Sequence, residues 1–346
     1  MSDAVAAAAN VAKKQRTDRP ILCTHSGTFH ADDALAASLL RVLPQYAQAE
    51  LRRSRDQKDW DEATVVFDVS GEYDAEKGRF DHHQRGFEEV FGHGFVTKLS
   101  SAGLIYKHYG QEILATLLQE PVSSPVVETL YLKMYQDFVE AFDGIDNGIT
   151  QYISSEPPRY RSRTDISSRV GALNPRWNEP SNEAILLERF EKASELAGNE
   201  FKERLDYLAK AWLPARDIVK RAVEQRKDEA HPSGKVLIFG EFAPWKEHLH
   251  ILEQDLSIPE NELPLYALYP ESEKPDSKWR VQAVAVSPES FESRKALPEA
   301  WRGVRDDALS QLSGIDGCIF VHAAGFIGGN QTKEGALQMA IKALEL

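Results

Sequence analysis

The sequence predicts an α/β protein built from two domains. Its 346 residues exceed one average domain and suit two. Short apolar runs alternate with segments of helical spacing, which is typical of sheets covered by helices. Hydrophobic residues make up 42% of the chain and charged residues 27%, which provides enough apolar material for two cores. We expect a larger N-terminal domain with a parallel sheet between helices, and a smaller C-terminal α/β or α+β domain with a mixed sheet.

The composition excludes several classes of protein. No apolar run approaches the roughly 18 residues of a membrane span, so we expect no membrane partner. Cys23 and Cys318 are the only cysteines, which gives no disulfide framework and indicates an intracellular, reducing compartment. A net charge of -13 argues against non-specific coating of duplex DNA. Bound cations would reverse this potential locally, so nucleic acid in a metal-loaded cleft stays open.

Residues 1–19 predict a disordered tail. An alanine run is followed by four basic residues between positions 13 and 19. A mitochondrial presequence would be rich in arginine and poor in acids, whereas Asp3 and Asp18 interrupt this pattern and serine is scarce. We therefore favour a tail over a targeting signal.

The first apolar run, 21–24, predicts a buried parallel strand that ends at His25. A loop then leads to His30, Asp32 and Asp33, and apolar residues at helical spacing follow. Ligands of open α/β sheets bind beyond the carboxyl ends of the strands. A helix N-cap would explain one of the acids. It would not explain two acids and two histidines around one loop.

Two further strands are expected over 49–54 and 64–67, and the second ends at Asp68 beside a glycine turn. An aspartate in this position often hydrogen-bonds its own turn, and that alternative stays open. Asp68 follows the end of a strand, as His25 does, so both side chains are expected at the same edge of a parallel sheet, where they could share a site.

A hairpin-like segment, 72–80, leads to Asp81, His82 and His83. A carboxylate and two imidazoles in a row can hold a divalent cation or address a phosphate oxygen. Surface histidine pairs are common, so the triplet gains weight only from the acids and histidines of the other segments.

Helices are expected over 100–110 and 124–142, and the apolar stripe of the second is core packing. Asp143 and Asp146 follow directly, three residues apart, so that both would face one side of a continuing helix. One of the two is expected merely to cap or solvate the turn.

The rest of the chain predicts a connector and a second domain. Residues 160–177 are rich in arginine, including Arg163, and form either a solvated loop or a clamp for phosphate. We expect a catalytic domain over 20–182, a helical connector over 183–232 and a substrate-binding domain over 233–346. In the last, strands are predicted over 235–242, 263–269, 279–287 and 318–321, and helices over 245–254, 297–312 and 333–346.

A glycine-rich stretch, 322–330, precedes the closing helix. It contains His322, Gly328 and Gly329, and backbone N–H groups at such a helix start can hold a phosphate. Glycines in a tight turn are the alternative.

These segments resemble known phosphoesterases. His25, His30-x-Asp32, Asp68, Asp81-His82-His83 and Asp143 stand in the order of the four motifs of the DHH superfamily, which includes the exonuclease RecJ and the manganese-dependent family II pyrophosphatases. A more specific resemblance, over 19–346, is to the melanocyte-proliferating-gene exonuclease family. It rests on residues 24–33, 67–71, 80–85 and 326–330. That family is regarded as a 3′-to-5′ RNA exonuclease of nuclei and mitochondria.

The resemblance implies a site with two divalent metal ions. The implied metal ligands are His25, His30, Asp32, Asp68, His82 and Asp143, with Asp33 as the alternative to Asp32. Asp81, His82 and His83 are the implied catalytic residues, and His83 would contact the substrate phosphate. One extra residue separates His25 from His30, and His30 replaces a carboxylate. The resemblance implies Mn²⁺. Mg²⁺ and Zn²⁺ stay open as alternatives, and imidazole ligands suit the later transition metals such as Zn²⁺ better than carboxylates do.

The second domain carries weaker resemblances. The stretch 322–330 is similar to the glycine-rich substrate motif of DHH accessory domains, which implies His322, Gly328 and Gly329 as substrate-binding residues. Ser293-Arg294-Lys295 is similar to a phosphate-binding Ser-Arg-Lys of the pyrophosphatases, and implies Arg294 and Lys295.

Three functions follow as hypotheses. The first is a metal-dependent phosphodiesterase that trims single-stranded RNA or short oligonucleotides from the 3′ end, by in-line hydrolysis between two metals. The second is a phosphohydrolase for pyrophosphate or a short nucleotide, favoured by the acidic composition and the lack of an obvious stacking platform. The third is a non-catalytic, metal-stabilised RNA-binding regulator. The nucleus, cytoplasm and mitochondrion are the expected compartments; no heteromeric partner is evident, and a homodimer stays open.

Overall fold

The computed structural model describes residues 19–153, 156–157 and 159–346, so the expected tail lies outside the described residues except for Arg19. The chain divides into two compact units, Met1–Asp206 and Tyr207–Leu346. The expected connector is shared between them: α8 (Glu183–Tyr207) lies almost wholly in the first unit, and α9 (Leu213–Glu229) lies in the second. None of the described helices has the length and apolar character of a membrane span.

The first unit is built on a five-stranded sheet of order β2-β1-β3-β5-β4. Four of its strands run parallel, and β4 pairs antiparallel with β5. The strands are β1 (Ile21–Thr24), β2 (Glu50–Arg53), β3 (Val65–Phe67), β4 (Tyr73–Asp74) and β5 (Arg79–Phe80). The predicted strands over 21–24, 49–54 and 64–67 are thus present. Because β1, β3 and β5 are parallel, the residues that follow them meet at one edge.

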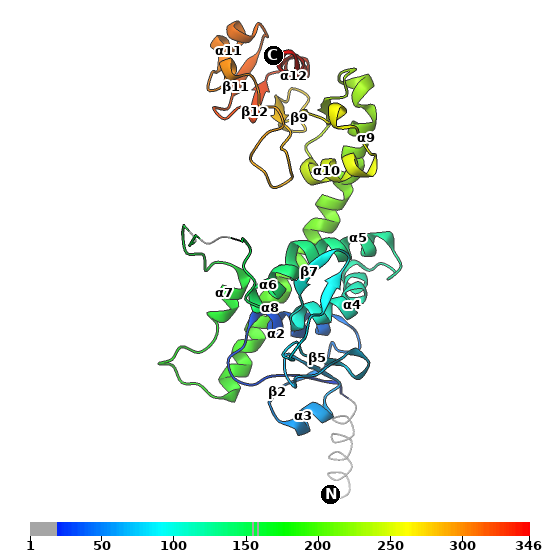
Figure 1. Ribbon diagram of the computed structural model, residues 1–346, viewed down its shortest axis with the longest axis vertical. Helices are drawn as coiled ribbons and strands as arrows, with labels where there is room; N and C mark the ends of the chain where they lie inside the picture. Colours follow the sequence, from blue (N-terminus) through cyan, green and yellow to red (C-terminus); the bar gives the residue numbers. More distant parts are fainter. Residues whose placement is uncertain (1–18, 154–155, 158) are drawn as a thin grey trace, which may run out of the picture. The chain divides into compact units, whose positions relative to one another are not determined.

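Helices cover both faces of this sheet because side chains alternate along its strands. Cys23 and Val66 pack with Trp60 of α3 (Gln57–Glu62) on one face. The buried side chains of Leu22 and Phe67 point to the other face, where the long helices lie (Figure 1). The remaining helices and turns are α2 (Ala31–Val42), η1 (Ala75–Lys77), α4 (Ser101–Leu118), α5 (Pro125–Met134), η2 (Tyr135–Val139), α6 (Glu140–Asp146) and α7 (Ile166–Gly171).

Helix α4 begins where the sequence predicts, since the Ser100 hydroxyl caps it by accepting from the Gly103 amide. It continues past Gly110 to Leu118. Gly110 is needed for close packing, because a Cβ there would lie 2.7 Å from the Tyr131 ring of α5. A small hairpin, β6 (Val90–Gly92) and β7 (Phe95–Lys98), precedes the helix.

A π-helical turn, η2, joins α5 to α6. Tyr135 at its start stacks on Phe91 of the hairpin, with ring centroids 3.7 Å apart. A π-helical turn takes in more residues than an α-helical turn, so it changes the direction in which later side chains point. Asp143 and Asp146 of α6 lie after this change.

The second unit has the mixed sheet that the sequence predicts, of order β11-β12-β10-β9-β8. Strands β8 and β9 pair in parallel, and the other neighbouring strands of this sheet pair antiparallel. Its strands are β8 (Val236–Ile238), β9 (Tyr266–Pro270), β10 (Trp279–Ala283), β11 (Cys318–Val321) and β12 (Ile327–Asn330). Its other helices are η3 (Leu208–Trp212), α10 (Trp245–Asp255), η4 (Glu260–Glu262), η5 (Glu299–Trp301), α11 (Asp306–Ser313) and α12 (Lys333–Glu345).

Alternation along β9 divides the core of this unit into two layers. Tyr266 and Leu268 pack with Met339 of α12. Ala267 and Tyr269 pack on the opposite face with Leu249 of α10. The sheet is therefore buried on both sides.

The contact between α2 and α8 can be tested at Gly198. A Cβ there would lie 1.8 Å from Ser38 Oγ and 2.8 Å from its Cβ. We expect Gly198→Ala to lower the free energy of unfolding by about 1–3 kcal/mol, because the helices must separate. Gly144→Ala in α6 is the control, since nothing lies within 4 Å of its Cβ and alanine favours a helix by up to ~1 kcal/mol. Denaturant unfolding that gives both variants the same stability would contradict this packing.

Candidate metal centre

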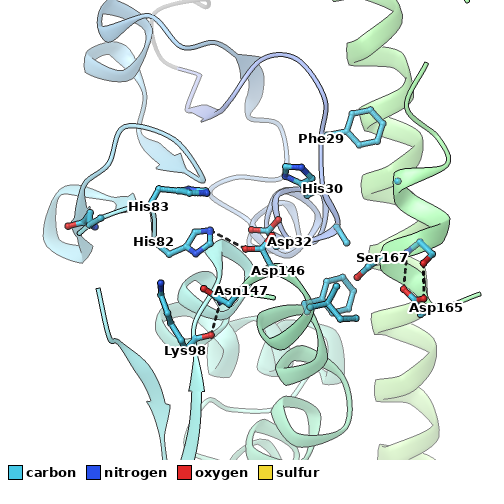
Figure 2. A pocket seen from close by; sticks show the side chains of 16 residues that line it. Phe29, His30, Asp32, His82, His83, Lys98, Asp146, Asn147, Asp165 and Ser167 are labelled. Atoms are coloured by element: carbon cyan, nitrogen blue, oxygen red, sulfur yellow. Dashed lines mark hydrogen bonds and ion pairs between the residues drawn. The ribbon is translucent and has the colours of Figure 1, made fainter. Parts of the chain in front are cut away.

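Acidic and imidazole side chains from five segments meet at the carboxyl edge of the first sheet. His25 follows β1, Asp68 follows β3, and the triplet 81–83 follows β5. The start of α2 adds Asp32 and Asp33, and the last residue of α6 adds Asp146. Figure 2 shows His30, His82, Asp32 and Asp146 around one space.

Asp68 is the centre of this cluster. Its Oδ2 lies 3.3 Å from His25 Nε2, and its Oδ1 lies 3.3 Å from His82 Nε2 and 3.5 Å from His83 Nδ1. The backbone of Asp68 has φ +56°, and that of Ser70 has φ +98°. Left-handed backbone at a residue other than glycine costs on the order of 1–3 kcal/mol and is concentrated at functional sites.

The Nε2 atom of His25 lies near two carboxylates, because it is 3.2 Å from Asp33 Oδ2 as well as 3.3 Å from Asp68 Oδ2. Burial by itself lowers the pKa of His25, but the two carboxylates outweigh it and raise the pKa to about 10. Burial acts to raise the pKa of Asp68, yet His25 and His82 lower that pKa to about 2. The pair is therefore held as a cation beside an anion.

Asp32 and Asp146 form the other side of the cluster. Asp32 is buried and its Oδ2 accepts a hydrogen bond from the Ser101 hydroxyl at 2.7 Å, while Asp146 Oδ2 lies 3.2 Å from His82 Nε2. Burial and then the charges of Asp68 and Asp146 raise the pKa of Asp32 well above its ordinary value. Burial likewise raises the pKa of Asp146. Carboxylates in such proximity repel one another, and a bound cation would relieve the repulsion.

Among the described residues, several buried polar atoms of the cluster form no hydrogen bond, although most of them lie within ion-pair distance of one another. These atoms are His25 Nε2, Asp32 Oδ1, Asp33 Oδ2, Asp68 Oδ1 and His82 Nε2. Leaving such atoms unsatisfied is costly, so a shared ligand is expected between them. Within the described residues, four overlapping groups have ligand atoms within 4.8 Å of one another, and Asp68 belongs to three of them. The donor set of carboxylate and imidazole fits divalent metal ions.

The remaining predicted residues of this edge surround the cluster. His30 is exposed at its mouth, and its ring centroid lies 5.7 Å from that of His25. Asp81 orients His83: its Oδ1 accepts from the His83 amide at 3.0 Å and lies 2.8 Å from His83 Nδ1. Asp81 Oδ2 accepts from the Gly71 amide at 2.5 Å. The His83 side chain is 64% exposed, so its Nε2 edge is available to a substrate.

Asp143 requires a correction, because the structure does not bring it into the cluster. Its Oδ1 accepts from the Ser100 amide at 2.9 Å and from the Ser100 hydroxyl at 2.7 Å. Its Oδ2 accepts from the Tyr135 hydroxyl at 2.8 Å. Burial raises the pKa of Asp143 to about 7. The oxygens are thus occupied in joining α4 to α6, and Asp146 stands where Asp143 was expected.

Two substrate-binding residues expected in the second unit, Arg294 and Lys295, bond to groups of that unit. Arg294 forms a two-pronged ion pair with Glu253, with N–O distances of 2.6 and 2.7 Å. Lys295 Nζ donates to the Leu344 carbonyl near the end of α12 at 2.9 Å. Both cations therefore stabilise the second unit itself.

The expected phosphate-binding loop is a strand. Gly328 and Gly329 lie within β12, paired with both β10 and β11. The neighbouring strand packs closely on Gly328, because a Cβ there would lie 3.0 Å from the Phe320 carbonyl oxygen. His322 is exposed, and its Nδ1 accepts from the Ala324 amide at 3.1 Å. Arg163 is exposed in the loop before α7.

Two cavities border the cluster, and His30 and His83 line both. One, of about 760 Å³, extends past Asp32 and Asp146 toward α7 and also contacts Lys98 and Asn147. The other, of about 740 Å³, extends past Asp68. It includes Arg55 and Trp60, and Arg55 Nη2 lies 3.3 Å from His25 Nδ1. Sequence reasoning missed Lys98 and Arg55, since neither belongs to a motif.

The chain is similar in sequence to one family of known proteins. The profile of the uncharacterised protein family UPF0160 matches residues 21–344. The chain is 51% identical to the MYG1 protein of Dictyostelium discoideum, over 93% of this chain and 96% of that protein. It is 49% identical to the MYG1 exonuclease of Homo sapiens, over 93% and 85%. A solved structure of exonuclease RecJ bound to manganese is 15% identical and covers 96% of this chain and 91% of that chain, with a TM-score of 0.24.

Metal binding by isosteric variants tests whether Asp146, rather than Asp143, is a metal ligand. We expect Asp146→Asn to weaken Mn²⁺ binding by at least about tenfold, because it removes a charged ligand, and Asp143→Asn to weaken it less, because Asp143 acts only by joining α4 to α6. Calorimetric titration with Mn²⁺ measures both, and circular dichroism verifies the folding of each variant. A larger loss of affinity in Asp143→Asn than in Asp146→Asn would contradict the assignment.

The raised pKa of His25, about 10, predicts proton release on metal binding. His25 is protonated near neutral pH without metal, and a metal ligand must be the neutral imidazole. Apparent Mn²⁺ affinity should therefore rise with pH, by about tenfold per unit for each displaced proton. Calorimetric titrations with Mn²⁺ between pH 6 and 8, in buffers of different ionisation enthalpy, give the number of protons released on binding. Affinity that does not change with pH would contradict this state of His25.

Proposed function

The chain belongs to the MYG1 exonuclease family, UPF0160, and on this premise we propose that it is a metal-dependent phosphodiesterase that removes nucleotides from the 3′ end of single-stranded RNA. The observation that carries the proposal is the convergence of buried carboxylate and imidazole side chains on Asp68. Curated relatives, including the human protein, bear the name exonuclease. The preference for RNA and for the 3′ end rests on resemblance to the family.

The proposed cofactor is a pair of divalent ions, with Mn²⁺ preferred. His25, Asp33 and Asp68 would hold one ion. Asp68, His82 and Asp146, with Asp32, would hold the other. When bound, such ions favour deprotonation of a water molecule near neutral pH and stabilise the charge that develops on phosphoryl oxygens.

The chain's own residues would position the phosphodiester. Asp81 holds the His83 ring by its Nδ1, so that Nε2 can donate a hydrogen bond outward to a phosphate oxygen. The hydrogen bond with Asp81 raises the pKa of His83, which favours the donating, protonated form. The cavity of about 760 Å³ adds an apolar side formed by Phe29, Phe142 and Ile145.

A small-substrate phosphohydrolase is the second candidate. Each cavity is of the size that holds a small ligand, and the two are similar in volume. Pyrophosphate or a dinucleotide would occupy such a site as readily as the end of an RNA chain. Relative turnover of these substrates decides between the candidates.

The function is tested with the isosteric variant Asp68→Asn. We expect it to lower release of nucleotides from a 5′-labelled RNA oligomer by about 10³-fold, on the order of 4 kcal/mol of transition-state stabilisation. Asp61→Asn is the matched control, since Asp61 is exposed on α3 and bonds only Gln57 in the described part of the chain. Gel analysis should show the wild-type protein and the control shortening the oligomer from its 3′ end in Mn²⁺.

Other results would assign other functions. Hydrolysis of pyrophosphate or dinucleotides with RNA left intact would support the small-substrate candidate. Zero or one bound ion, without hydrolysis of any substrate, would favour a non-catalytic RNA-binding protein. Full activity of Asp68→Asn would show that the reaction does not depend on the metal centre.

A further inference from the structure

The charge balance at the metal centre calls for an additional cation. Asp32, Asp33, Asp68 and Asp146 carry four negative charges when ionised. Two divalent ions would neutralise these four charges, and no net positive charge would then remain to attract an anionic substrate. Binding a phosphodiester, which the proposed function requires, is therefore favoured by a basic side chain in the adjoining cavity.

Lys98 is such a side chain. It is the last residue of β7 and lines the cavity of about 760 Å³ together with His82 and Asp146. Figure 2 shows it extending from its strand toward His82. It is half-buried, and its Nζ lies 5.6 Å from the centroid of the Phe87 ring.

The ammonium group of Lys98 has no carboxylate within ion-pair distance among the residues that the structure describes. Its Nζ lies instead over the Phe87 ring. Lys107, on the neighbouring helix α4, shows the contrast: it pairs with Glu89 and donates to the Val90 carbonyl at 2.7 Å. Lys107 is thus occupied by the fold, whereas Lys98 remains available to an anion.

The backbone fixes Lys98 relative to the metal centre. Asn147 Nδ2 donates to the Lys98 carbonyl and to the Asp143 carbonyl, both at 2.9 Å. These bonds join the end of β7 to the end of α6, which carries Asp146. Ser100, two residues after Lys98, binds Asp143 of the same helix. Lys98 is therefore positioned in advance of binding, which lowers the cost of ordering it.

We propose that Lys98 is a substrate-binding residue, whose ammonium group pairs with an anionic oxygen of the substrate phosphate in this cavity. The exposed side chain of Ile145 in the same cavity would contact the attached nucleoside. This inference rests on the proposed function and adds to it the residue that attracts the anion.

The test compares Lys98→Met with Lys98→Arg, and uses Lys58→Met as the control. Methionine keeps most of the length and removes the charge, and arginine keeps the charge. Lys58 is an exposed lysine of α3. The primary readout is the affinity for a fluorescent RNA oligomer of phosphorothioate linkages, measured by anisotropy with Mn²⁺ at several KCl concentrations. The Mn²⁺ affinity of each variant is measured separately, and thermal unfolding verifies its fold.

We expect Lys98→Met to bind the oligomer at least about tenfold more weakly, and the slope of log affinity against log salt to fall by about 0.7, the value for one contact with a single strand. Lys98→Arg should retain affinity within about threefold, because the charge remains. Mn²⁺ affinity should be unchanged in both. In hydrolysis, the loss should appear as a raised KM rather than as a lost metal ion.

The outcomes separate this inference from the proposed function. Wild-type protein that binds and shortens RNA, with affinity and salt slope unchanged in Lys98→Met, overturns the role of Lys98 alone. Wild-type protein that binds pyrophosphate but no RNA, with pyrophosphate binding lost in Lys98→Met, refutes the RNA substrate and supports the role of Lys98. Binding of neither anion refutes both.

Discussion

Electrostatic repulsion within a buried cluster of carboxylates is the constraint on which the rest of this structure depends. Asp32, Asp33 and Asp68 are almost fully buried within one group, and Asp146 lies beside them. Burial and mutual charge raise the pKa of Asp32, while His25 offsets part of the repulsion. Such an arrangement is unfavourable by itself. It becomes favourable when divalent cations occupy the space between the carboxylates.

A second layer of residues fixes the cluster without contacting a cation. Ser101 holds Asp32, and the Gly71 amide holds Asp81, which in turn orients His83. Asp143 serves this layer too, because it joins the start of α4 to α6. Gly103 of α4 makes room for it: a Cβ there would lie 2.3 Å from Asp143 Oδ1. These contacts restrict the ligands to one geometry, which is how a metal site gains affinity and selectivity.

Much of the centre could be predicted because parallel strands end at one edge. Apolar runs placed His25 and Asp68 at strand ends, and the order of the motifs added the triplet 81–83. The choice between Asp143 and Asp146 failed because α-helical periodicity cannot anticipate the π-helical turn at Tyr135–Val139. The glycines of β12 were misread, since a sequence does not distinguish glycines of a turn from those that allow close packing in a strand. Lys98 lacks any motif, and its importance emerges only from the side chains around it.

Anomalous diffraction at the manganese edge, from crystals grown with Mn²⁺, tests the central claim most directly. We expect density peaks within coordination distance of Asp68, with His25 and Asp33 around one and His82 and Asp146 around the other. Peaks absent from this space, with the carboxylates instead bonded to protein groups or to water, would contradict the account.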